Sequence, residues 1–252
     1  MASSAPMPKR DPKPDKTQSE TSPPRAVEPR GARRKRETRE RLLRAAFELI
    51  AERGADAVAI NEITEAADVG FGSFYNHFES KDAIHTAVLR MVFDGFGSAL
   101  DELSASIEDP AEKVSVATRH AIATATREPL WGQLLLREWY RPETFPSGLG
   151  PRLLRDIIAG VAGKRFKVAD PLVALVLAGG TVVAAVGLQL AVGGLGSKLV
   201  DQAGLSGVDI DRRVASTLLQ ALGIKQAEAE TIAGRALPIL HWTPNFSTSE
   251  SS

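Results

Sequence analysis

Side chains able to do chemistry are concentrated in one short stretch, VGFGSFYNHF, at residues 69–78. It contains one of the two tyrosines, one of the four histidines and three of the nine phenylalanines, with two glycines among them. Histidine, tyrosine and serine can bind a metal, take part in catalysis or hydrogen-bond a partner, and glycines allow close approach of the backbone. The stretch is therefore the first candidate for a functional site.

Catalytic and metal-binding chemistry find no support in the spacing of these residues. The four histidines, His77, His85, His120 and His241, lack metal-ligand spacing. The segment GFGSF lacks the Lys-Ser/Thr of a phosphate-binding loop, and no nucleophile-elbow pattern accompanies the Ser-Gly pairs. With no cysteine, disulfides and thiolate sites are excluded and a reducing compartment is favoured. The sequence predicts a protein that is not an enzyme and has no cofactor or metal.

Charge is unevenly distributed along a chain with no net charge. Residues 1–41 contain twelve Lys/Arg and six Asp/Glu, so the remainder is acidic. A basic head favours an anionic partner near the N-terminus, although a merely solvated tail is an equal alternative. Residues 1–32 are rich in Pro, Ser, Lys and Asp and are predicted to be disordered. No apolar segment typical of a secretory signal follows the basic residues, so we expect a cytoplasmic protein.

Three short helical elements are predicted between residues 33 and 80. Leu42, Phe47 and Ile50 share one helical face before Gly54, a suitable C-terminal cap. A short helix follows in AINEITEAADVG, and a tight turn at residues 68–70 leads to a third helix, FGSFYN. Two short helices joined by a tight turn form the helix-turn-helix pattern, whose second helix enters the DNA major groove.

Each residue type in the third helix suits contact with DNA. Gly70 leaves backbone N–H groups free for a phosphate, and Gly72 allows the helix to approach the duplex closely. Phe71 can pack on a thymine methyl group, whereas Phe74 and Phe78 are expected to point inward. The predicted DNA-contacting residues are Asn61, Gly70, Phe71, Gly72, Ser73, Tyr75, Asn76, His77 and Lys81. The basic run RRKRETRER could add phosphate attraction or minor-groove contacts, or be only a solvated helix start.

The rest of the chain is predicted to be all-α, because apolar residues there recur with helical rather than alternating spacing. One helix is expected to start at Lys81 with Ser80 as its N-cap, and the next at Asp109-Pro110. Further helices are expected to start at Pro129, Pro151 and Pro171, followed by helices at 209–222 and 225–235. Residues 172–192 carry no charge and could be read as a membrane span. Their glycines, Thr181 and Gln189, and the Asp170-Pro171 start, favour instead a helix buried in the subunit or against a second copy.

The segment IxxITxAADVGFGSFYNHFESKDAI resembles the DNA-binding signature of the TetR family of transcriptional regulators, with the match covering residues 36–90. The matching residues are Ile63, Ala67, Val69, Gly72, Tyr75, His77, Phe78 and Lys81. Four positions depart from the family pattern: Ala59 replaces a capping threonine, Thr64 an alanine, Asp68 the turn glycine and Gly70 an N-cap serine. A phosphate contact at Gly70 would therefore come from the backbone alone.

This resemblance implies a homodimer that binds a pseudo-palindromic operator on double-stranded DNA, usually as a repressor released by a small molecule. It places the DNA-binding domain at residues 33–80 and the effector-binding and dimerisation domain at 81–242, with a flexible tail at 243–252. The dimer interface is expected at residues 171–192 and 209–222.

Effector-contacting candidates are large or polar residues of the second domain, for each of which plain core packing is the alternative. They are Met91, Phe96, Trp131, Phe145 and Gln189. Because these candidates are mostly apolar, a hydrophobic or amphipathic effector is expected. Rival functions are a DNA-binding activator, a ligand-independent regulator, or a helical small-molecule-binding protein or enzyme without DNA binding.

Overall fold

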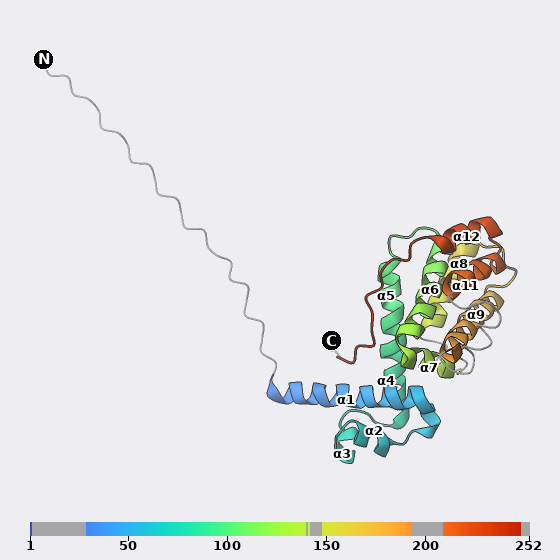
Figure 1. Cartoon of the computed structure of the whole chain (residues 1–252). Coiled ribbons are helices and arrows are strands. Elements are labelled where there is room, and N and C mark those ends of the chain that lie inside the picture. The colour runs from blue at the N-terminus through green and yellow to red at the C-terminus, as the bar shows by residue number, and fades with distance from the viewer. Residues whose placement is uncertain (2–28, 140, 142–147, 193–208, 248–252) are drawn as a thin grey trace.

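A computed structural model describes residues 1, 29–139, 141, 148–192 and 209–247. Its described residues form helices and no strand, which confirms the all-α prediction. Figure 1 shows a small N-terminal unit, α1 to α3, beneath a larger helical body, with α4 running from the unit into the body. The candidate residue Phe145 and most of the predicted N-terminal extension lie outside the described residues.

The N-terminal unit contains α1 (Arg30–Arg53), the 3-10 turn η1 (Ala55–Ala57), α2 (Ile60–Ala66) and α3 (Phe71–Phe74). Helix α1 ends where the sequence predicted: Gly54 has φ +84°, and its N–H donates to the Ile50 carbonyl at 2.8 Å. That backbone conformation favours glycine. Helix α3 is shorter than predicted, because Tyr75, Asn76 and His77 form turns that follow it.

The long helix predicted from Lys81 is interrupted by one irregular segment. It consists of α4 (Lys81–Leu89), the π-helical segment η2 (Arg90–Asp94) and α5 (Gly95–Leu103). Ser80 caps α4 as predicted, since its Oγ accepts a hydrogen bond from the Ala83 N–H at 3.1 Å. A π-helical turn rotates the residues beyond it relative to those before it, and such turns are frequent at functional sites.

The body contains α6 (Pro110–Arg127), α7 (Pro129–Glu138), α8 (Leu149–Ala162), α9 (Pro171–Val192), α11 (Ile210–Ala221) and α12 (Gln226–Gly234). Helix α6 is central and contacts α7, α8, α9, α11 and α12. The predicted caps are present: Asp109 accepts from the Ala111 N–H at 3.0 Å, and Asp170 from the Leu172 N–H at 2.7 Å.

Two hydrophobic cores hold the molecule together. One lies within the body, between α6, α8, α9, α11 and α12. The other is continuous from α1 through α4 and η2 to α7, and it includes Leu42, Phe74, Val88 and Trp131. Because the N-terminal unit shares this closely packed core with the body, we expect a repacking of α5 or α7 to displace α1.

Helix α9 has one buried and one exposed apolar face. Among the described helices, α9 alone is long and apolar enough to cross a membrane, judged by length and composition. Here it packs on α6, α7 and α8 through a face that includes Ala174, Leu175 and Ala178. The opposite face is apolar but exposed, and Val176 retains 63% of its accessible surface. One face of α9 is thus buried within the subunit, and packing of the exposed face against a second copy stays a prediction.

The end of the chain differs from the expected flexible tail. After α12 the chain runs extended beside α5 towards α1, as the red segment of Figure 1 shows. Residues 243–247 belong to this segment, and the Phe246 side chain is buried against Phe47 of α1. The tertiary contacts of Phe246 explain the difference, because an extended segment has no apolar periodicity that a sequence would reveal.

Candidate DNA-binding surface and effector cavity

The turn between α2 and α3 is fixed by local hydrogen bonds and by α1. Asp68 occupies the left-handed region with φ +52°, a conformation that Asp tolerates better than most residues. The Val69 N–H donates to the Thr64 carbonyl at 3.0 Å, and Arg41 of α1 donates to the Asp68 carbonyl at 3.2 Å. Asp68 thus replaces the usual glycine without loss of the turn.

Helix α2 has an alternative to the missing side-chain cap at Ala59. The Ala59 N–H donates to the Glu62 carboxylate at 2.8 Å, and Arg53 of α1 donates to the same side chain at 2.8 Å. Hydrogen bonds from Arg53 and then from the Ala59 backbone lower the pKa of Glu62. Glu62 therefore secures the start of α2 and ties it to α1, with Asn61 exposed beside it.

Aromatic residues of the VGFGSFYNHF stretch divide into a buried and an exposed set. Phe74 and Phe78 are buried, as predicted, with the Arg39 guanidinium 4.9 Å from the centre of the Phe78 ring. Phe71 is 50% exposed and Tyr75 53% exposed, and their rings meet edge to face with centroids 5.7 Å apart. Gly70, Gly72 and Asn76 are exposed around this pair, and Ser73 is half-buried. The stretch thus exposes the rings of Phe71 and Tyr75 and buries those of Phe74 and Phe78 beneath them.

His77 and Lys81 have structural contacts in addition to the predicted DNA contacts. His77 is half-buried, and its Nδ1 makes no hydrogen bond to any described residue. Burial, followed by the nearby charges of Lys35 and Arg39, lowers the pKa of His77. Lys81 Nζ donates to the Ala55 carbonyl at 3.0 Å and approaches that of Asp56 at 3.5 Å. An ammonium group has three donors, so one remains for a phosphate.

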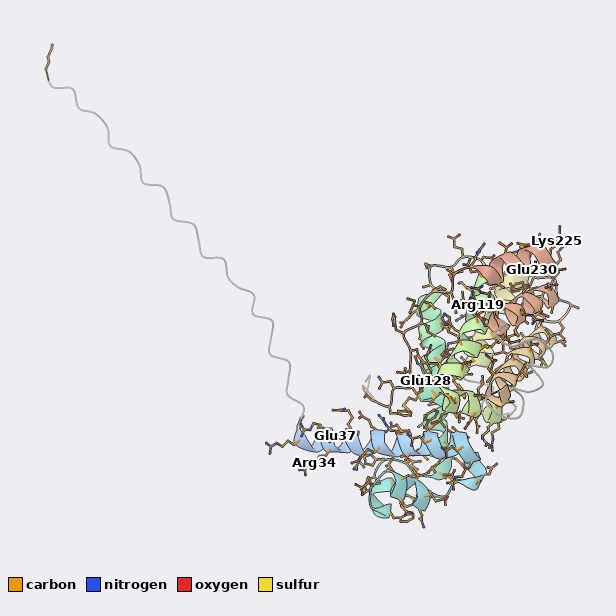
Figure 2. All side chains as sticks on the ribbon, viewed as in Figure 1. Arg34, Glu37, Arg119, Glu128, Lys225 and Glu230 are labelled. Carbon is orange, nitrogen blue, oxygen red and sulfur yellow. The ribbon has the colours of Figure 1, made fainter. Side chains whose placement is uncertain are left out.

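Helix α1 adds a surface of basic residues beyond α3. Arg33, Arg34 and Lys35 are exposed, and Figure 2 shows Arg34 and Glu37 on the end of α1 that projects past α2 and α3. Two ion pairs within the helix, Arg33 with Glu37 at 3.4 Å and Arg36 with Glu40 at 2.9 Å, neutralise part of the charge. The Arg33–Glu37 pair is exposed, and exposed pairs contribute little stability, so Arg33 can exchange this partner for a phosphate.

The buried and exposed aromatic residues should respond differently to truncation. Phe74→Ala is expected to lower the free energy of unfolding by about 3–5 kcal/mol, because a fully buried ring leaves a cavity. Phe71→Ala is the matched control, since its ring is half exposed, and it should change stability by less than about 0.5 kcal/mol. Urea unfolding followed by circular dichroism measures both. Equal losses in the two variants would contradict the assignment of faces.

A cavity of about 80 Å³ lies between α5, α6, α7, α8 and α9. Its walls are mostly apolar side chains, and Phe96, Leu135 and Trp139 contribute rings and methyl groups. A single water needs roughly 10–15 Å³ of cavity space, so this cavity suits a small organic molecule. Close packing of α7 on α9 forms one wall, where a Cβ at Gly179 would lie 1.9 Å from the Trp139 ring.

Charged residues of α5 and α8 gather at one side of the cavity. Asp101, Arg152 and Asp156 line it, and Lys113 and Thr118 of α6 also contribute to the lining. Arg152 donates to Asp101 at 3.0 Å and to Asp94 at 3.2 Å. A carboxylate and a guanidinium beside apolar walls can bind the hydroxyl groups of a ligand that is otherwise apolar.

The pKa values of the two carboxyl groups that line the cavity, Asp101 and Asp156, are shifted in opposite directions. Burial raises the pKa of Asp156, and hydrogen bonding from Arg155 offsets this only in part. Burial also acts on Asp101, but hydrogen bonds from Arg155 and Arg152 outweigh it and lower the pKa of that carboxyl. Asp101 is therefore the permanent anion of the pair, and Asp156 is the one that acid protonates first.

Of the effector-contacting candidates chosen from the sequence, Phe96 lines this cavity. Trp131 packs behind Phe96 with ring centroids 4.8 Å apart, and Met91 packs against the larger core. Gln189 donates to Thr126 at 3.4 Å, away from the lining residues. Sequence reasoning missed Asp101, Arg152 and Asp156. The available signal was a pair of opposite charges four residues apart, Arg152 and Asp156, on helix α8, whose one other charged residue is Arg155.

Helix α7 connects the cavity to the N-terminal unit. Leu135 and Trp139 line the cavity, whereas Arg137 donates to the Ala51 carbonyl of α1 at 2.8 Å. The buried Glu138 carboxylate lies 3.2 Å from Nε2 of His85 on α4. A change in the cavity wall therefore has a short path to α1 and α4.

A helix-turn-helix unit joined to a helical body with a partly polar cavity is the architecture of a helix-turn-helix regulator. The chain belongs to the TetR family. Residues 42–88 match the family model described as bacterial regulatory proteins, tetR family, and residues 109–235 match the tetracyclin repressor-like C-terminal domain. Both assignments agree with the resemblance read from the sequence.

Similar proteins of known structure and name fall in the same family. The crystal structure of RolR in complex with resorcinol has a TM-score of 0.60 and 33% identity, covering 83% of this chain and 99% of that chain. The transcriptional repressor DhaR of Mycobacterium sp. strain GP1 is 39% identical over 28% of this chain and 34% of its own. The repressor KstR2 of Rhodococcus jostii strain RHA1 is 36% identical over 36% and 43% of the two chains. The chain thus spans less than half the length of these two repressors.

Proposed function

We propose that the protein is a transcriptional repressor that binds a pseudo-palindromic DNA operator as a homodimer and is released by a small phenolic compound. The observation that carries the proposal is the polar-sided cavity, whose wall helix α7 also holds α1 and α4. One helix that contacts both the ligand space and the DNA-binding unit allows occupancy to change DNA affinity.

DNA binding is supported by the exposed surface of α3 and its surroundings. Phe71 and Tyr75 would meet the major groove, while Gly70 and Gly72 keep the backbone close to the duplex. The exposed basic residues of α1 would contact the phosphates. The nine predicted contacts therefore stand as proposals, with Lys81 also serving to join α4 to η1.

Dimerisation is supported by the exposed apolar face of α9. Leu172, Val173, Val176, Leu177 and Leu188 are all exposed large apolar residues on this one helix. A Cβ added at Gly180 would meet no described atom within 4 Å, so this glycine has open space in front of it. Glycine on an apolar helix face allows another helix to approach closely, and we assign this face to a second copy. Helix α11, also expected in the interface, presents the polar residues Arg212, Arg213 and Thr217.

A phenolic effector is supported by the size and chemistry of the cavity. Its small volume favours a single ring, its apolar walls suit the ring faces, and Asp101, Arg152 and Asp156 can hydrogen-bond hydroxyl groups. The similar protein RolR was crystallised with resorcinol, a benzene ring with two hydroxyl groups. Resorcinol is therefore the first compound to test.

The experiment is a fluorescence anisotropy titration of the dimer against the DNA upstream of its own gene, at moderate salt. We expect a specific dissociation constant of about 10⁻⁸ M or tighter, against much weaker binding to unrelated DNA. Saturating resorcinol should weaken operator binding at least about fivefold. Equal affinity for both DNAs would refute the repressor assignment, and an unchanged operator affinity with resorcinol would refute the effector class.

A further inference from the structure

The C-terminal segment at residues 236–247 is not explained by the family match, which ends at residue 235. This segment, called the strap below, leaves α12, runs beside α5 and reaches α1 (Figure 1). Its residue Ile239 is 75% exposed, whereas Leu240 and Phe246 are buried. The strap is therefore attached to the molecule at particular residues rather than along its whole length.

The first attachment is at the wall of the effector cavity. The Trp242 ring packs edge to face on Phe96, with centroids 5.1 Å apart, and Phe96 itself lines the cavity. A Cβ at Gly95 would lie 3.3 Å from Trp242 Nε1, so this glycine gives the indole room. Arg127 of α6 donates to the Trp242 carbonyl at 3.3 Å. A ligand that displaces Phe96 must therefore also displace Trp242.

The second attachment is on the DNA-binding unit. Phe246 is 6% exposed, and its ring centroid lies 5.4 Å from that of Phe47 on α1. The Arg44 guanidinium, one turn earlier on α1, is 5.5 Å from the centre of the Phe246 ring. An aromatic contact of this type is worth about 0.5–1.5 kcal/mol beyond its burial, so the attachment is specific.

Only a few residues separate the two attachments. Extended chain spans at most about 3.3–3.6 Å per residue, so the four residues after Trp242 reach at most about 14 Å to Phe246, and Pro244 restricts the conformation of this piece. The strap holds α1 near residues 44–47, whereas α7 holds its last turn through Ala51. Two attachments at different points along α1 can set its tilt, and with it the direction of α3.

We propose that the strap transmits occupancy of the effector cavity to α1, so that residues 236–247 are part of the allosteric machinery. This inference rests on the proposed function and adds a second route to the one through α7. Trp242 and Phe246 act as positioning residues, because they touch neither the cavity interior nor the predicted DNA surface. When an effector displaces Phe96, the displacement is transmitted to α1 through the segment from Trp242 to Phe246.

The decisive variant lengthens the strap without removing either attachment. A Gly-Gly-Gly insertion between Thr243 and Pro244 adds up to about 10 Å of slack. In the full-length protein we expect resorcinol affinity and effector-free operator affinity within about twofold of the wild type. The factor by which resorcinol weakens operator binding should fall at least about fivefold. Ile239→Ala, on the exposed part of the strap, is the matched control and should leave that factor unchanged. An insertion variant that responds as fully as the wild type overturns the proposal.

A second measurement needs no effector and so separates this inference from the proposed function. Amide hydrogen exchange of residues 42–51 is followed in four chains: the wild type, Trp242→Ala, the Gly-Gly-Gly insertion, and the insertion combined with Trp242→Ala. In the strap of natural length, Trp242→Ala should speed exchange in this part of α1 about tenfold relative to the wild type. On the lengthened strap it should have almost no effect. Equal effects on both straps, or none on the wild-type strap, would overturn the inference even if the protein never responds to resorcinol.

Discussion

Gly180→Arg is expected to convert the proposed homodimer into monomers and to weaken operator binding about a hundredfold or more. Within one subunit the Cβ of the substitution has room, since beyond the neighbouring backbone of α9 no described atom lies within 4 Å of it. In a helix-helix interface the same arginine would be buried without a partner, which costs about 3–5 kcal/mol. A monomer can occupy one half-site only and loses the advantage of two linked contacts. Sedimentation equilibrium and operator titration measure the two effects.

The neighbouring glycine provides the contrast that makes this result interpretable. A Cβ at Gly179 would clash with the Trp139 ring inside the subunit, so Gly179→Ala should destabilise the monomer itself. Gly180→Ala, in contrast, should fold normally or slightly better, because alanine favours a helix by about 1 kcal/mol over glycine. If Gly180→Arg remains a dimer with full operator affinity, the exposed face of α9 is not the interface.

Features that depend on residues close together in the sequence, such as helix ends and the exposure of aromatic side chains, could be predicted from it. The alternation of Phe71 and Tyr75 with Phe74 and Phe78 predicted which aromatic residues are exposed and which are buried, and the structure confirms it. The predicted stop at Gly54 and the predicted cap at Ser80 are also confirmed, because each depends on neighbouring residues only. The same logic explains why Asp68 can occupy the left-handed turn position.

Features that depend on packing between distant segments were not predictable in this way. Asp101 and Arg152 are about fifty residues apart in sequence and meet only because α8 packs beside α5. Their pattern in the sequence is that of ordinary solvated helix charges. Size and polarity in the sequence favour large apolar residues such as Trp131 for the cavity, yet such residues are better suited to fill a core. The strap could not be predicted because its buried residues, Leu240 and Phe246, stand in an extended segment without helical periodicity.

Asp156→Asn is expected to weaken resorcinol binding about 10- to 100-fold, the value of a hydrogen bond to a charged group. The substitution keeps the shape of the side chain and removes its charge. Isothermal titration calorimetry measures the affinity, and 1,3-dimethoxybenzene, which has no hydroxyl donor, is the matched ligand. That ligand should bind the wild type and Asp156→Asn equally weakly. An unchanged resorcinol affinity in Asp156→Asn would exclude Asp156 from the binding site.

Unfolding measurements can show that this loss is not a loss of structure. Burial raises the pKa of Asp156 in the folded protein, so its contribution to stability is complete below the unfolded pKa and is lost as pH rises through the folded pKa. At neutral pH the ionised, buried carboxylate is therefore a cost. The neutral amide of Asp156→Asn removes that cost, and the variant should be at least as stable as the wild type at neutral pH. If Asp156→Asn were strongly destabilised at neutral pH, the ionised Asp156 carboxylate would not be a cost to stability.

The pH dependence of binding identifies the carboxylate that receives the hydroxyl group. A hydroxyl that donates to Asp156 favours the ionised form, so resorcinol affinity should be complete above the Asp156 pKa and fall as pH drops through it. Because that pKa is raised, the decline should begin at a higher pH than an ordinary aspartate would give. Asp101 has a lowered pKa and stays ionised through this range. Asp156→Asn should therefore abolish the decline, whereas an identical decline in the variant would assign the proton to another group.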